Sequence, residues 1–186
     1  MIKLAKAFEE KSTEGKIRGC VGAIDSFLAT ISRPMLCNCA NNPGAFHYMT
    51  YGINIQAVCD VESRFIFFGL IAPGKCSNQV AFDLTSLPNR ISSFDTGFYL
   101  VGDAAYTLLD VMLVAFVGSQ RDDCSQDAYN LFISQQRIRI EMAFGLLQTK
   151  WGELKRNITT GWLGNNIKNS RSMCPTTQLC HRKKDI

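Results

Sequence analysis

Three acidic residues end or interrupt apolar stretches that would otherwise form buried core. Asp25 and Asp103 each follow a short apolar run with the length of a buried strand, and Glu141 lies within a longer apolar stretch of helical length. An ionised carboxylate in apolar surroundings costs several kcal/mol unless it is paired or bound to a metal. The three acids together therefore indicate a shared cation.

The chemistry that such a trio could perform is phosphoryl transfer. Carboxylate oxygens are hard ligands that suit Mg²⁺ or Mn²⁺. One or two of these ions can activate a water or a 3′ hydroxyl and stabilise the leaving oxygen during attack on a phosphodiester. A second interpretation stays open for each acid alone, because a carboxylate just after a strand is often an N-cap or turn residue.

The elements that must position these acids follow from the apolar pattern. We expect strands at 19–24, 53–59, 65–71 and 98–101, and helices from the N-terminus through Lys11, at 77–84 and, with Ser125 as N-cap, at 126–150. The second and third strands form an antiparallel hairpin whose nearly all-apolar second strand is the more buried. This order predicts a mixed α/β layer in which the strands that precede Asp25 and Asp103 lie side by side.

Composition places the chain among globular proteins. At 186 residues and 46% hydrophobic, it is long enough for one domain with a real core. The first ten residues carry too much charge for a signal peptide, and no 18-residue uncharged apolar window follows, so we expect an intracellular protein without a membrane span.

Eight cysteines are then expected to be reduced thiols. A weaker alternative is that some of them bind zinc, because two groups look like half-sites. These are Cys37 with Cys39, and Cys174 with Cys180 and His181. Neither group has a second half-site nearby in the sequence.

Positive charge is concentrated near the C-terminus. Residues 151–186 carry seven Lys or Arg against two acids, a net charge of +5 in a chain whose total is +4. Such a segment attracts phosphate, although solvated basic tails also occur in proteins that bind no nucleic acid. We expect residues 157–186 to be a poorly ordered basic tail and residues 1–17 to be a charged N-terminal segment.

Four blocks of the sequence identify a family. Residues 19–25, 51–60, 99–106 and 140–147 resemble, in that order, the blocks of the DDE endonuclease domain of Harbinger-type (PIF/Harbinger) transposases. The resemblance covers roughly residues 18–156. It implies an RNase H-like fold, a mixed sheet with flanking helices.

The same resemblance implies a function and its residues. The first acid of the family's motif falls on Asp25, the second on Asp103 within Gly-Asp-x-Ala-Tyr, and the Glu on Glu141 within Glu-x-Ala-Phe-Gly. These residues would be the catalytic ligands of Mg²⁺ or Mn²⁺ in a nuclease that acts on DNA. The family also implies a nuclear location and a separate Myb-like DNA-binding partner.

The chain departs from the family pattern at several places. Ser26 stands where many relatives have Gly, and Ser77-Asn78 where many have His-Asp or Asn-Asp. The tail lacks the usual amphipathic helix, and the helical region that usually precedes the domain is absent. The alternative is therefore a catalytically inactive transposon remnant that keeps the fold, with at most a DNA- or protein-binding role.

Three other residues have plain structural interpretations. Arg137 lies one helical turn before Glu141, and we expect either a surface ion pair between them or contact with a DNA phosphate. Tyr106 and Phe144 are expected in the core rather than stacked on DNA bases.

Overall fold

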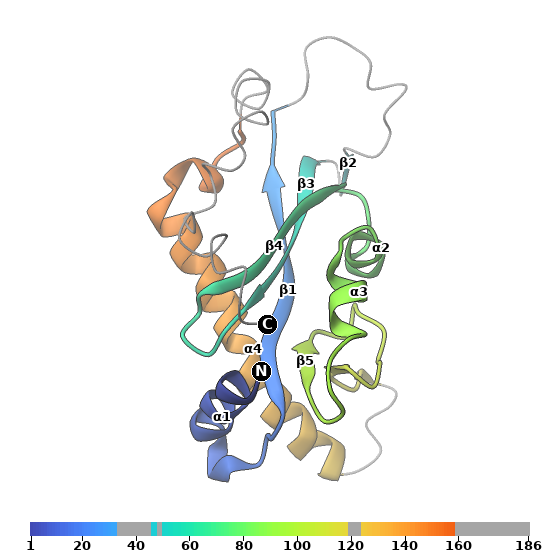
Figure 1. The fold of residues 1–186 in the computed structure, drawn as a ribbon. Helices are drawn as coiled ribbons and strands as arrows, with labels where there is room; N and C mark the ends of the chain where they lie inside the picture. Colours follow the sequence, from blue (N-terminus) through green and yellow to red (C-terminus); the bar gives the residue numbers. More distant parts are fainter. Residues whose placement is uncertain (33–45, 48–49, 119–123, 159–186) are drawn as a thin grey trace.

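A six-stranded mixed sheet with helices on both faces forms the body of the protein (Figure 1). The computed structural model describes residues 1–32, 46–47, 50–118 and 124–158. The strands are β1 (Cys20–Thr30), β2 (Phe46–His47), β3 (Thr50–Cys59), β4 (Phe65–Pro73), β5 (Tyr99–Gly102) and β6 (Met112–Val114). The helices are α1 (Ile2–Lys11), α2 (Asn78–Asp83), α3 (Leu87–Ile91) and α4 (Cys124–Lys150), with 3₁₀ turns η1 (Thr13–Gly15) and η4 (Gly152–Lys155).

Strand β1 lies at the centre of the sheet. It pairs antiparallel with β3 on one side and parallel with β5 on the other. Strand β4 pairs antiparallel with β3, which confirms the predicted hairpin, and β6 extends the sheet parallel to β5. The predicted adjacency of the two acid-bearing strands is therefore confirmed.

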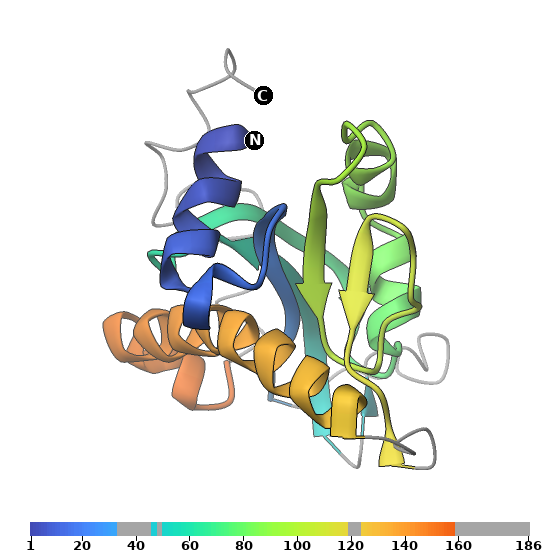
Figure 2. The same cartoon turned by 90° about the horizontal axis from the view of Figure 1, so that it is seen from below.

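The helices divide between the two faces of the sheet. Helix α4 crosses one face, with α1 beside it, while α2 and α3 lie on the other (Figures 1 and 2). Ile140 and Phe144 of α4 share a buried cluster with Ala23 of β1. Phe82 of α2 and Ile91 of α3 belong to a second cluster on the opposite face. Two apolar layers thus enclose β1, β3 and β5, as the α/β prediction required.

Strand β1 is longer than predicted. The expected strand ended before Asp25, whereas β1 continues to Thr30, so that Asp25 lies in mid-strand. The cause is continuous pairing with β3, from Ala23 opposite Cys59 to Thr30 opposite Gly52. Long-range strand pairing therefore outweighs the low strand propensity of an Asp.

The expected burial of the hairpin strands was wrong. Strand β3 is the more buried of the two, because it lies between β1 and β4. Its polar residues Asn54 and Gln56 are buried as well, and the side chain of Gln56 has a partner within the core. A central strand can hold polar residues when their hydrogen bonds are made.

One helix was not predicted. Helix α3 begins at Leu87 with Pro88 in its first turn, where proline is tolerated. Helix α4 begins at Cys124, two residues earlier than expected. Helix α2 begins one residue later than predicted, because Ser77 is its N-cap and accepts a hydrogen bond from the Val80 N–H.

Some predictions concern residues outside the described part of the chain. The zinc half-sites fall there, as do residues 159–186 of the expected tail. Within the described residues, no helix combines the length and apolar character that a membrane span requires.

Candidate active site

Asp25 and Asp103 lie close to each other near the end of β5. Ala23 lies opposite Val101 in the parallel register, each acid follows its strand's paired residue by two positions, and the charge of Asp103 raises the pKa of Asp25. Neighbouring strands are about 4.8 Å apart, and residues two positions apart share a face. Because Ala23 and Val101 both pack in the cluster beneath α4, the two carboxylates lie on the face that α4 crosses.

Each of these acids also makes a local hydrogen bond. Asp25 Oδ1 accepts from the Ser26 N–H at 2.7 Å, and Asp103 Oδ1 accepts from the Ala105 N–H at 3.0 Å. The second bond closes the turn after β5, together with the Tyr106 N–H bonded to the Asp103 carbonyl. The turn interpretation of Asp103 is therefore correct, and it is compatible with a second role for the same side chain.

Helix α4 brings Glu141 and Arg137 to the same region. Arg137 Nη2 lies 2.9 Å from Glu141 Oε1, which confirms the predicted pair one turn apart. The same nitrogen lies 3.9 Å from Asp25 Oδ2, a contact that the sequence did not predict. A guanidinium therefore lies between an acid of the sheet and an acid of the helix.

The electrostatics of Asp25 reflect this crowding. Burial raises the pKa of Asp25 from 3.8 to about 6, and the charges of Asp103 and Glu141 act in the same direction. The Ser26 N–H and the Arg137 guanidinium oppose the rise but do not cancel it. Burial therefore disfavours the ionised form of Asp25, and a cation bound beside it would favour that form again.

The residue types at this site suit a divalent metal, but the distances between their side chains do not. Three carboxylates are the donor set that Mg²⁺ or Mn²⁺ prefers, and two of them lie on adjacent strands. However, no three His, Cys, Asp or Glu side chains in the described part of the chain are close enough to hold one ion. Glu141 is instead paired with Arg137, whose guanidinium also faces Asp25.

Comparison with known proteins places this site in a family. A family model described as DDE superfamily endonuclease matches residues 24–174, which is most of the chain. The chain belongs to the DDE superfamily endonucleases. No curated protein and no solved structure gives a significant match.

The endonuclease domain contains a buried chain of polar side chains that the sequence did not indicate. The Tyr106 hydroxyl donates to Gln56 Oε1 at 2.7 Å, and Gln56 Nε2 donates to Asn54 Oδ1 at 2.9 Å. Burial, and then the charges of Asp25 and Asp103, raise the pKa of Tyr106 well above its usual range, so its hydroxyl remains a donor. Tyr106 is a core residue, as predicted, and it ties the loop after Asp103 to β3.

Replacing Tyr106 with Phe should lower the free energy of unfolding by about 1–2 kcal/mol, because Gln56 Oε1 would be left buried without its donor. Urea unfolding followed by circular dichroism measures this loss. In a double-mutant cycle with Gln56→Leu, the two losses should not add, since both variants remove the same bond. Simple additivity of the two losses would contradict the proposed coupling.

One departure from the family pattern lies away from the acids. Ser26 Oγ donates to Asn78 Oδ1 at 2.6 Å, which joins β1 to α2. Successive strand residues point to opposite faces, so this bond is on the α2 face while Asp25 faces α4. The two departing positions thus contact each other, and neither takes a ligand from the side where Asp25 and Asp103 meet.

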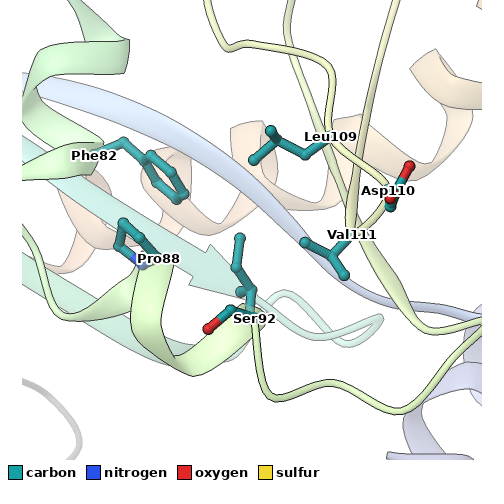
Figure 3. Close-up of a pocket in the computed structure, with 7 residues that line it drawn as sticks. Phe82, Pro88, Ser92, Leu109, Asp110 and Val111 are labelled. Carbon is teal, nitrogen blue, oxygen red and sulfur yellow. The ribbon is translucent and has the colours of Figure 1, made fainter.

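An apolar hollow lies elsewhere in the endonuclease domain. It has a volume of about 330 Å³ and is lined mainly by Phe82, Pro88, Leu109 and Val111, near α2, α3 and the start of β6 (Figure 3). None of the three acids borders it. It therefore has no part in the carboxylate site.

Proposed function

We propose that this chain is a Harbinger-type, transposase-derived endonuclease domain that cleaves DNA phosphodiester bonds with Mg²⁺ or Mn²⁺ held by Asp25, Asp103 and Glu141. The observation that carries the proposal is the placement of Asp25 beside Asp103 on the face crossed by α4, the helix that bears Glu141. The mixed sheet with β1 at its centre supports an RNase H-like fold.

The residues of the site have distinct roles in this proposal. Asp25 supplies a partly buried carboxylate whose pKa is raised by burial, so a bound cation would favour its ionised form. Asp103 ends β5 in a turn that keeps its carboxylate at the accessible end of the strand. Bound divalent ions would activate the attacking water or hydroxyl and neutralise charge on the phosphodiester.

The proposal extends to the surroundings of the domain. The endonuclease domain occupies residues 18–156, after the charged segment 1–17, and the basic tail 157–186 adds attraction for DNA phosphates. A separate Myb-like partner would supply target recognition in the nucleus. The chain alone should then bind DNA with a strong salt dependence and no sequence preference; selective binding of one sequence would argue against the need for such a partner.

Nicking of supercoiled DNA tests the function. The purified chain should convert plasmid to the nicked form with Mg²⁺ or Mn²⁺, and EDTA should stop the conversion. A variant carrying Asp25→Asn, Asp103→Asn and Glu141→Gln should be inactive with an unchanged circular dichroism spectrum. Nicking that persists in EDTA or in this variant would refute the proposal.

An inactive remnant is the second candidate. It is favoured by the absence, among the described residues, of three potential ligands close enough to share an ion. Calorimetric titration with Mn²⁺ separates the two candidates. Saturable binding that the triple variant lacks would support the nuclease, whereas no binding at millimolar Mn²⁺ would support the remnant.

A further inference from the structure

Arg137 occupies the region into which the three acids would have to converge. Its Nη2 is 2.9 Å from Glu141 Oε1 and 3.9 Å from Asp25 Oδ2. The Arg137 side chain is 22% exposed and that of Asp25 is 17% exposed, whereas that of Glu141 is 57% exposed. The guanidinium is therefore not a surface group, because it is partly enclosed beside the sheet.

The contacts of Arg137 are incomplete. The 3.9 Å to Asp25 is too long for a hydrogen bond, and the buried Nε–H has no hydrogen-bond partner among the described residues. A buried donor without an acceptor is unfavourable. Arg137 is thus held mainly by the surrounding negative charge and not by a matched set of acceptors.

A structural ion pair elsewhere in the chain shows the contrast. Arg64 Nε donates to Asp60 Oδ2 at 2.8 Å, while Asp60 Oδ1 accepts from the N–H groups of Glu62 and Arg64. Both oxygens of that buried acid have partners, and the pair closes the turn between β3 and β4. The pairing of Arg137 has no such completeness, although it lies among more acids.

We infer that Arg137 takes the place of a metal cation in the metal-free protein, and that divalent binding requires Arg137 to release Glu141. This inference rests on the proposed function, since it concerns the same three acids. It accounts for the position of the guanidinium, which contacts Glu141 and faces Asp25. Arg137 then competes with the ion, lowers its affinity and keeps the acids partly neutralised until the ion arrives.

Metal titration of matched variants tests this competition. In calorimetry with Mn²⁺, Arg137→Gln should bind roughly tenfold or more tightly than the wild-type chain, because a competing positive charge is gone. Arg139→Gln is the control. Arg139 lies on the same helix and also has a buried Nε without a hydrogen-bond partner among the described residues, but it is not in contact with the three acids. The Arg139→Gln variant should bind Mn²⁺ with the same affinity as the wild-type chain.

The outcomes separate this inference from the proposed function. If the wild-type chain binds Mn²⁺ and Arg137→Gln binds it equally or more weakly, Arg137 does not compete with the ion, and the nuclease proposal still stands. Absence of binding in the wild type and in both variants would overturn the proposed function and the inference with it.

A measurement on the wild-type chain covers the case in which Arg137→Gln fails to fold. The NMR signal of the Arg137 Nε–H should shift during titration with Mg²⁺, while that of Arg139 stays in place. Arg137→Lys, which keeps the charge, identifies the signal by its disappearance. An Arg137 signal that does not respond at saturating Mg²⁺ would overturn the inference.

Discussion

Asp25→Asn should reduce metal-dependent nicking by more than about 100-fold, since even residues that only support a metal ligand typically contribute 10–100-fold. Asparagine keeps the size of the side chain and an oxygen that can accept from the Ser26 N–H. The charge is what is lost. The Asp25 side chain is only partly exposed, whereas that of Glu141 is exposed.

The rate of plasmid nicking at saturating Mg²⁺ measures this effect, with Asp110→Asn as the control. Asp110 is exposed and lies at the apolar hollow, apart from the carboxylate site, so its loss should leave the rate unchanged. A rate for Asp25→Asn within about threefold of the wild type would exclude Asp25 as a metal ligand.

Local apolar patterns predicted most of the elements that hold these acids. The hairpin, the strand before Asp103 and the long helix are each readable from a continuous run bounded by turn or cap residues. Their assembly could also be predicted in outline, because short strands and one long helix admit few layered arrangements.

The details that depend on long-range pairing could not be read from the sequence. The continuation of β1 past Asp25 is imposed by β3, a strand more than twenty residues away. Gln56 and Asn54 alternate with apolar residues, as in a half-exposed strand, yet both are buried, with hydrogen bonds from Tyr106 to Gln56 and from Gln56 to Asn54. A half-exposed strand and a buried one with paired polar residues have the same sequence pattern, and only the elements that cover β3 distinguish them.

The candidate site was predictable only in part, because some of its contacts also depend on long-range packing. Asp25 and Asp103 follow from strand adjacency, which family blocks and apolar runs both indicate. The sequence spacing of Arg137 and Glu141 predicts only their ion pair within the helix. The contact of Arg137 with Asp25 depends on how α4 is rotated over the sheet, which the spacing does not determine. Whether the three acids form one metal site stays a prediction.

Asp25→Asn should also stabilise the metal-free protein near neutral pH, by up to about 3 kcal/mol in the free energy of unfolding. The pKa of Asp25 is about 6 in the folded protein against an ordinary value of 3.8. The folded chain therefore holds this proton more tightly than the unfolded chain. The resulting stability is fully present below pH 3.8 and is lost as the pH rises through 6.

Urea unfolding in EDTA at a series of pH values from 3.5 to 8 measures the difference between wild type and variant. The two curves should coincide at the acid end and separate as Asp25 ionises in the wild type. Added Mg²⁺ should narrow the gap, because an ion that binds only the folded wild type stabilises it by mass action. A variant no more stable than wild type at pH 7.5 would show that Asp25 has its counter-charge without a metal, and the acids would then be a finished ion-pair network in which Arg137 is a permanent member.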